Sequence, residues 1–203
     1  MAGRVAGKIK LQTVDELLGV PEIAGTQEIE IGRIHAFPNH PFKVLDDERM
    51  DMLVESIREN GILNPVIVRP DKNGDYEMIS GHRRLHAAGI VGLSKIPAIV
   101  KEMSDDEAII KMVDANIQRE EILPSEKAFA YKMKLDALKR TAGRPTKENA
   151  CHNGTHLRSD QELALQVGDS ARSIQRYIRL TELIPELLEC IDNKKLGLVI
   201  AVD

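Results

Sequence analysis

The stretch YEMISGHRRLHAA (76–88) joins a strand-like run to the start of a helix, and the rest of the sequence is interpreted around it. Gly81 supplies a small-residue turn, and Arg83 and Arg84 then fall in the first helical turn. The amino end of a helix carries partial positive charge, which disfavours cations there. Three interpretations stay open. In the first, the arginines pair with surface carboxylates such as Glu77, and each ion pair contributes about 0–1 kcal/mol to stability. In the second, they bind a polyphosphate together with free helix N–H groups, and in the third they contact DNA.

The sequence on either side of this stretch predicts a small mixed sheet with two helices. Residues 71–74, DKNG, carry a hairpin-turn signal between two apolar runs. Residues 46–60 have apolar side chains at helical spacing and an acidic first turn, and Gly61 is a natural stop. We expect strands at 28–34, 65–70, 75–80 and 95–103, and helices at 46–60 and from near His82 to near Gly89.

Beyond residue 103 the chain is expected to be helical. Ser104 and Glu107 form a capping-box pattern before an apolar helical run, and Pro124 opens a second helix to about Lys139. The fold class is therefore α+β, with a small mixed-sheet domain followed by an all-helical domain. We divide the chain into a flexible arm (1–27), a mixed-sheet domain (28–103), connecting helices (104–139), a polar, aperiodic linker (140–159) and a helical region (160–203) that we expect to be truncated at its end.

The helical region has the spacing of a helix-turn-helix motif. Apolar residues of 160–167 share one face, Gly168 makes the turn, and a second helix covers 171–180 with Ile174 and Ile178 directed inward. Arginine side chains can reach phosphates and guanine, and glutamine can reach adenine. A solvated basic αα-hairpin is the alternative. The residues expected to face DNA are Ser170, Arg172, Ser173, Gln175, Arg176 and Arg179.

A second polar group lies at the end of the helix that follows Ser104. Asn116, Gln118 and Arg119 come just before a break at Leu123-Pro124. They are either a solvated helix end or part of a site in which Arg119 adds a phosphate donor. In such a site the Asn116 amide oxygen could reach a magnesium ion, since Mg²⁺ prefers oxygen ligands.

Composition excludes several classes of protein. Aromatic residues make up only 3% of the chain, which argues against a single-strand binder built on stacked rings, and the net charge of -4 requires any DNA contact to come from a local patch. Two cysteines, Cys151 and Cys190, do not form a disulfide framework. Without a long apolar run or a signal-peptide pattern, we expect a cytoplasmic protein that does not contact a membrane.

The order of these motifs resembles the ParB family of plasmid and chromosome partition proteins. The resemblance covers roughly residues 28–190 and rests on PNHP (38–41), GHRRLHAA (81–88), ANIQRE (115–120) and LPSEKAFAY (123–131), followed by the helix-turn-helix. GHRRLHAA is similar to the family's G-E-R-R-x-R-A box. The linker and LPSEKAFAYKMK are similar to partition-like proteins carried by plasmids and integrative elements.

The resemblance implies a ParB/sulfiredoxin-like fold that binds CTP and Mg²⁺. It further implies a homodimer that closes into a clamp on double-stranded DNA at a palindromic site, a ParA-type ATPase as partner, and association with the nucleoid. By position, the nucleotide site consists of Gly81, His82, Arg83, Arg84, Asn116, Gln118 and Arg119, with Asn116 as the Mg²⁺ ligand; Pro38, Asn39, Pro41 and Lys43 match the first family box incompletely.

Two departures from the family pattern leave hydrolysis open. His82 stands where the family has Glu, and Ala115 replaces an acid before Asn116, so slow CTP hydrolysis is uncertain whereas CTP binding through arginines is expected. Asp114 could compensate only at a distorted helix end. The basic arm, with Arg4 and Lys8, could stimulate the ATPase of the partner.

Two other functions remain as alternatives. One is a helix-turn-helix transcriptional repressor without clamp closure. The other is a sulfiredoxin-like phosphotransfer enzyme or a nuclease, against which stand the lack of a cysteine beside Gly81 and acidic runs typical of helix starts.

Overall fold

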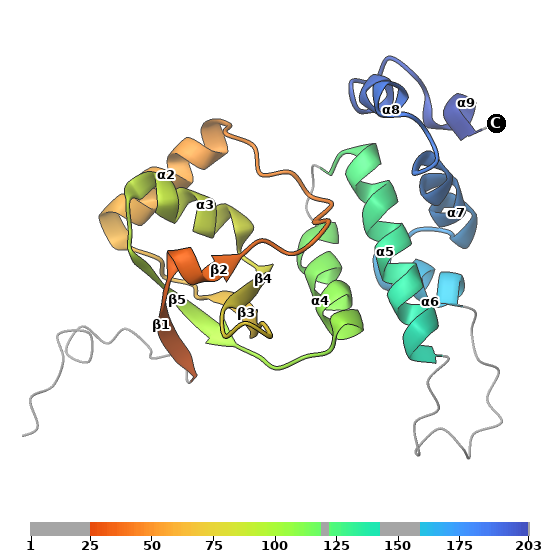
Figure 1. Cartoon of the computed structure of the whole chain (residues 1–203). Coiled ribbons are helices and arrows are strands. Elements are labelled where there is room, and N and C mark those ends of the chain that lie inside the picture. The colour runs from red at the N-terminus through yellow and green to blue at the C-terminus, as the bar shows by residue number, and fades with distance from the viewer. Residues whose placement is uncertain (1–24, 119–121, 143–158, 203) are drawn as a thin grey trace, which may run out of the picture.

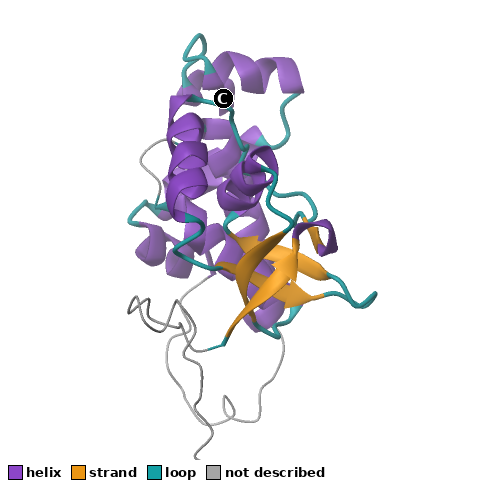
Figure 2. Cartoon of the chain, turned by 90° about the vertical axis from the view of Figure 1, so that its left-hand side faces the viewer, coloured by secondary structure: helices purple, strands orange, loops and turns teal. Residues whose placement is uncertain are grey.

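The computed structural model describes residues 25–118, 122–142 and 159–202. The sheet, which has five strands, lies at one end and most of the helices at the other (Figure 2). Helices α4 (Asp105–Ile117) and α5 (Pro124–Ala142) stand between the sheet and the helices that follow them in the chain, as Figure 1 shows. The predicted fold class is therefore confirmed: a small mixed sheet is followed by an all-helical part.

The sheet has the strand order β1-β5-β3-β4-β2. Strands β3 (Val66–Pro70) and β4 (Tyr76–Ser80) form the predicted antiparallel hairpin, in which the Asp71 N–H donates to the Asp75 carbonyl at 2.8 Å. Strand β5 (Lys95–Val100) runs parallel to β3, so the sheet is mixed. Valines and isoleucines of these strands, with Met78, fill the core on the sheet.

The strand predicted over 28–34 is confirmed only in part, because the chain is not one continuous strand there. The chain forms β1 (Thr26–Glu30), turns through a short 3-10 helix η1 (Ile31–Arg33), and pairs again as β2 (Ile34–His35) at the opposite edge of the sheet. Polar and apolar residues alternate from Glu28 to Ile31, but Gly32 and Arg33 break the alternation before Ile34, and the turn falls at this break.

Two helices, α2 (Glu48–Asn60) and α3 (His82–Val91), pack against each other in a second apolar cluster. Asp47 caps α2 by accepting from the Met50 N–H at 2.8 Å. Helix α3 begins at His82 and ends at Val91, two residues beyond the Gly89 expected, and is capped by Gly92, whose φ of 85° is left-handed. Because a helix interior tolerates glycine, Gly89 did not stop it.

Helices α4 and α5 form the third cluster with the sheet, and α5 also packs on the helices that follow it. The predicted capping box is confirmed, since Ser104 and Glu107 bond each other's backbone N–H groups. Tyr131 and Leu135 of α5 contact Leu163 and Ile174 in a buried cluster. Helix α5 is thus part of the mixed-sheet core and of the helical core.

The helical part contains α6 (Ser159–Val167), α7 (Ala171–Leu180), α8 (Pro185–Asp192) and α9 (Leu198–Val202). Both helices of the predicted helix-turn-helix are therefore present, joined through Gly168 with a left-handed φ of 73°. Of the predicted linker, residues 140–142 belong to α5 and residue 159 to α6, while the rest lies outside the described residues, as does most of the arm. Among the described helices, none is long and apolar enough to cross a bilayer.

Candidate functional site

The turn between β4 and α3 is built on Gly81. Its φ of 111° lies in the left-handed region, and a Cβ there would lie 2.7 Å from Cγ1 of Val66, so only glycine fits. Gly81 is also the residue that precedes the first turn of α3, and glycine has no side chain to cap the N–H groups of that turn. A ligand with anionic oxygens can therefore take the place of a cap.

The two arginines after this turn point to different places. Arg83 Nη2 donates to Asp47 Oδ1 at 3.1 Å, whereas Arg84 Nη1 donates to the carbonyl oxygens of Asn64 and, at 2.9 Å, of Pro65. Burial of the Arg84 guanidinium lowers its pKa below the usual value. Arg84 thus fixes the loop before β3, and Arg83 is the arginine that remains available to a ligand.

Neither arginine pairs with Glu77, so that part of the surface interpretation is wrong. The Glu77 carboxylate accepts instead from Arg69 of the neighbouring strand, at 2.5 Å. Arg69 also reaches Asp105 at 2.7 Å, and its side chain is only 15% exposed. Through its contacts with Glu77 and Asp105, Arg69 connects the β3–β4 hairpin to the start of α4.

Asp47 has two functions, since it caps α2 and holds Arg83. Burial acts to raise the pKa of its carboxyl group, but the Met50 N–H and the charge of Arg83 outweigh this and bring the pKa below its ordinary value. The carboxylate is therefore ionised at neutral pH and competes with any anion for Arg83.

Arg83 lines a pocket of about 520 Å³, which we call the Arg83 pocket. Its walls come from the loop before α2, from the start of α2, from α3, from the start of α5 and from the end of α8. The ionisable residues lining it are Lys43, Asp47, Arg49, Arg83, Glu126, Asp192 and Lys194. Two units of the fold that are distant in sequence therefore meet at one arginine-bearing pocket.

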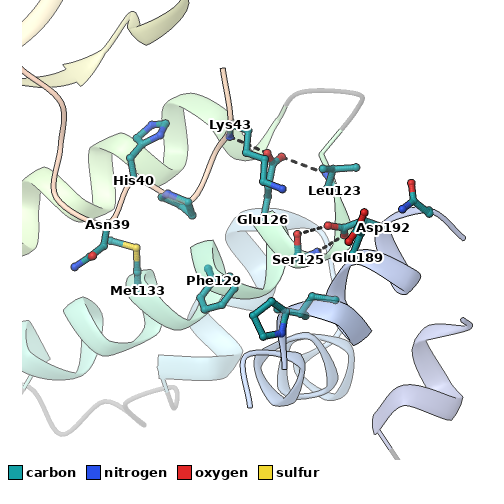
Figure 3. A pocket seen from close by; sticks show the side chains of 14 residues that line it. Asn39, His40, Lys43, Leu123, Ser125, Glu126, Phe129, Met133, Glu189 and Asp192 are labelled. Atoms are coloured by element: carbon teal, nitrogen blue, oxygen red, sulfur yellow. Dashed lines mark hydrogen bonds between the residues drawn. The ribbon is translucent and has the colours of Figure 1, made fainter. Parts of the chain in front are cut away.

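A larger pocket of about 890 Å³ lies between α5, α8 and the loop 39–43, and Figure 3 shows it. Phe129 and Met133 of α5 line it. It shares residues with the Arg83 pocket but does not contain Arg83. The Arg83 pocket suits an anionic ligand better than the larger pocket does, because an arginine can bind phosphate, whereas phenylalanine and methionine cannot.

Two carboxylates of α5 and α8 separate these pockets and hold their walls together (Figure 3). Glu126 accepts from the backbone N–H of Lys43 at 2.8 Å and from that of Leu123 at 3.3 Å. Asp192 accepts from the Ser125 N–H at 2.9 Å and from its hydroxyl at 2.6 Å. These contacts connect residues up to 67 positions apart, and no local sequence signal could have found them.

His82 does not line either pocket. It is buried at 9% exposure, and its ring centroid lies 3.8 Å from that of His40 in the loop before α2. The His40 Nδ1 in turn lies 2.7 Å from the Phe42 carbonyl oxygen. In this arrangement the histidine pair packs the β4–α3 turn against the loop 39–43.

The second polar group does not come together as a continuous site. Asn116 is 2% exposed and its Nδ2 donates to the Met112 carbonyl at 2.7 Å, while Gln118 is exposed at the end of α4. Arg119 lies outside the described residues. Neither Asn116 nor Gln118 lines the Arg83 pocket. Asp114 pairs with Lys134 at 2.5 Å on a regular helix, so it does not compensate for Ala115.

The donors around Asn116 limit how a magnesium ion could be bound. Within the described ranges, no group of three or more His, Cys, Asp or Glu side chains could hold a metal. Asn116 can offer its Oδ1, because its Nδ2 is bonded to the helix. A single amide oxygen fits only a Mg²⁺ ion that arrives on the phosphates of a nucleotide, which is how Mg²⁺ is commonly bound.

The outer face of α7 carries the predicted DNA-contacting residues. The Ser170 hydroxyl caps the helix by accepting from the Ser173 N–H at 3.0 Å. Arg172, Gln175 and Arg179 are exposed and Arg176 is half-buried, while Ile174 and Leu180 are buried on the opposite face. Within the part of the chain that the structure describes, the three arginines form no ion pair with a carboxylate.

Asp169 connects the turn of the helix-turn-helix to α5, a role that the sequence did not suggest. The Lys127 Nζ lies 2.7 Å from its carboxylate, which also accepts from the Tyr131 hydroxyl. Burial acts to raise the pKa of Asp169, but these two donors lower it overall. The pKa of the Tyr131 phenol is raised, mainly by burial and further by its hydrogen bond to Asp169.

Fold and site together define a class: a small mixed-sheet unit with an arginine-bearing turn, joined by one long helix to a helix-turn-helix. Residues 15–117 match the ParB N-terminal domain. The match covers half of the chain, and the chain belongs to the ParB family.

Relatives and a solved structure agree with this assignment. The chain is 33% identical over 170 residues to the chromosome-partitioning protein Spo0J of Thermus thermophilus, and 31% identical over 198 residues to the nucleoid occlusion protein of Listeria monocytogenes serotype 4a. These alignments cover 84% and 96% of this chain but 56% and 62% of those proteins, so the chain spans less than two thirds of their length.

The fold is similar to that of the C-terminally truncated chromosome-partitioning protein ParB from Caulobacter crescentus, solved in complex with the centromeric parS site. The TM-score is 0.53 at 24% identity, over 86% of this chain and 82% of that one. At this identity the likeness concerns the fold.

Proposed function

We propose that this chain is a DNA-binding, nucleotide-regulated partition protein of the ParB type. The observation that carries the proposal is the Arg83 pocket, because its walls come both from the mixed-sheet unit and from α8 beside the helix-turn-helix. A ligand in such a pocket contacts the nucleotide-type fold and the DNA-reading part at the same time. The names of the two relatives, one for chromosome partitioning and one for nucleoid occlusion, support this reading.

The ligand proposed for the pocket is CTP with Mg²⁺. Arg83 and the uncapped N–H groups after Gly81 bind phosphate oxygens, and the resemblance of GHRRLHAA to the family box supports CTP as the nucleotide. Mg²⁺ would neutralise phosphate charge. The family resemblance makes Asn116 its protein ligand and adds Gln118 and Arg119 to the site, which requires a nucleotide that extends beyond the Arg83 pocket, since neither Asn116 nor Gln118 lines that pocket. His82 and Arg84 shape the turn rather than bind the nucleotide, since both are engaged by the protein.

The proposed DNA-contacting element is α7, which carries Arg172, Ser173, Gln175, Arg176 and Arg179 after the cap at Ser170. Exposed arginines without ion-pair partners in the described part of the chain are suited to phosphates and to guanine. The structurally similar protein from Caulobacter crescentus is solved with its parS site, which supports DNA as a ligand of this chain.

The remaining expectations are proposals drawn from the family resemblance. They are a homodimer that closes as a clamp on a palindromic site, a ParA-type ATPase as partner, a place on the nucleoid in the cytoplasm, and a role on a plasmid, a mobile element or a chromosome. The division into an arm (1–27), a mixed-sheet domain (28–103), connecting helices (104–139), a linker (140–159) and a helix-turn-helix region (160–203) is likewise proposed.

A crosslinking experiment separates the clamp from the repressor. Gln27 of the edge strand β1 is exposed, so Gln27→Cys in a background with both native cysteines replaced by serine reports on the approach of two mixed-sheet units. The proposal predicts that CTP together with palindromic DNA raises the crosslinked fraction. If DNA binds but CTP leaves crosslinking unchanged, the chain is a plain repressor.

A further inference from the structure

Lys194 extends the Arg83 pocket from the side of the helix-turn-helix. It comes from the segment between α8 and α9, far in sequence from Arg83 on α3, and both residues line the same pocket. Asp192, two residues earlier, is held by Ser125 at the start of α5 (Figure 3). The end of α8 is therefore fixed against the pocket wall, and Lys194 is presented to the pocket rather than to open solvent alone.

The backbone of Lys194 occupies a position that usually belongs to glycine. Its φ is 58°, in the left-handed region, and its N–H donates to the Ile191 carbonyl at 2.9 Å, while the next N–H reaches the Cys190 carbonyl at 2.8 Å. Helices commonly end in this way, with glycine at the left-handed residue, because a Cβ is disfavoured there. A lysine brings no benefit to the backbone at this position, so the reason for a lysine here lies in its side chain.

The carboxylates of the Arg83 pocket have partners within the protein, whereas its lysine ammonium groups have no carboxylate partner among the described residues. Asp47 holds Arg83, Glu126 accepts from two backbone N–H groups, and Asp192 accepts from Ser125. Neither the Lys43 nor the Lys194 ammonium forms an ion pair with a carboxylate in the described ranges. Four cations and three carboxylates line the pocket, a formal charge of +1. With its acids engaged, the pocket presents Lys194 and Lys43 to an anion.

We propose that Lys194 binds the phosphates of the ligand held by Arg83, so that one bound nucleotide is contacted by both units of the protein. This inference rests on the proposed function of the pocket. The nucleotide then ties the segment after α8 to α3, and the position of the helix-turn-helix depends on whether the pocket is occupied. By linkage, if the bound nucleotide raises the affinity for DNA by some factor, bound DNA raises the affinity for the nucleotide by that same factor.

The test is calorimetry with Mg²⁺–CTP and, separately, with inorganic triphosphate. Lys194→Gln removes the charge and keeps most of the side chain, and we expect about a tenfold loss of affinity for both ligands, the size of a charge-assisted hydrogen bond. Lys195→Gln is the matched control, because Lys195 is the exposed neighbour that does not line the pocket, and its affinity should equal that of the parent.

A second variant separates binding from folding. Lys194→Gly suits the left-handed backbone, so its melting temperature should equal or exceed that of the parent while its nucleotide affinity falls like that of Lys194→Gln. Equal affinity of the parent and both Lys194 variants would overturn this inference and leave the proposed nucleotide site standing, provided that Arg83→Ala loses at least about tenfold in affinity. Failure of the parent to bind either ligand would instead overturn the proposed site, and this inference with it.

Discussion

Asp47 and an incoming phosphate compete for the same guanidinium. The Asp47 carboxylate is ionised because its pKa is lowered, and it holds Arg83 at 3.1 Å. Asparagine caps a helix as well as aspartate does, so Asp47→Asn keeps the contact to the Met50 N–H and removes the competing charge.

We therefore predict that Asp47→Asn binds Mg²⁺–CTP about twofold to fivefold more tightly than the parent, as judged by calorimetry. The melting temperature should change little, since the cap is kept. Weaker binding by Asp47→Asn would mean that the carboxylate positions Arg83 for the ligand rather than competing with it.

Gly81 is the residue on which the turn depends most. Gly81→Ala combines a left-handed φ with a Cβ only 2.7 Å from Val66, and we predict a loss of about 2–4 kcal/mol in the free energy of unfolding, measured by chemical denaturation. Gly92→Ala is the control. Its φ is also left-handed, but no atom lies within 4 Å of the added Cβ, so the loss should stay near about 1 kcal/mol. Equal losses in the two variants would contradict the close packing at Val66.

At the scale of single residues, the sequence predicted the glycine turn and the arginine pair but not the different contacts of the two arginines. Arg83 reaches Asp47, 36 positions away, and Arg84 reaches carbonyl oxygens of the loop before β3. These partners depend on how α2 and the loop before β3 lie against α3. That arrangement is tertiary and leaves no periodic trace in the sequence.

Helix α7 is the element whose surface the DNA proposal depends on. Arg176→Ala should weaken binding to a palindromic duplex by about 1–3 kcal/mol if Arg176 contacts a base, and should reduce the salt dependence of binding by about one charge if it contacts a phosphate. Fluorescence anisotropy across a salt titration distinguishes the two. Arg58→Ala on α2 is the control, because Arg58 is an exposed arginine paired with Glu55 and distant in sequence from the helix-turn-helix. Identical titrations for Arg176→Ala and Arg58→Ala would remove Arg176 from the interface.

The link between α5 and the helix-turn-helix should make stability depend on acidity. The pKa of Asp169 lies below its ordinary 3.8, so its contribution is present above that value and is lost as the pH falls through the lowered pKa. Asp169→Asn should be less stable than the parent by about 2 kcal/mol at pH 7, with the difference shrinking below about pH 4. Unfolding curves for both proteins from pH 7 to pH 3 provide the measurement. A difference that stays constant over this range would show that the ionised carboxylate is not the stabilising group.

At the scale of elements, local signals predicted most of the helices well. The capping box at Ser104, the hairpin turn at 71–74 and both helices of the helix-turn-helix depend on neighbouring residues and were confirmed. The crossing from β1 to β2 was missed because the alternation of residues 28–31 was extended to Ile34, although Gly32 and Arg33 interrupt it where the chain leaves one edge of the sheet for the other.

For the whole molecule, α5 is the common element. Its first turn holds the loop 39–43 through Glu126 and the end of α8 through Ser125, and its middle holds the turn of the helix-turn-helix through Lys127 and Tyr131. A change in the Arg83 pocket therefore acts on the same helix that positions the DNA-reading surface. This arrangement supports a ligand-dependent relation between the two units, in line with the proposed function.

The central claim is that Arg83 binds the phosphates of a nucleotide, and calorimetry of Mg²⁺–CTP with the parent and with Arg83→Ala tests it most directly. The account predicts that the parent binds and that Arg83→Ala, folded by circular dichroism, loses at least about tenfold in affinity. Equal affinity of the parent and the variant, or no binding by either, would contradict it.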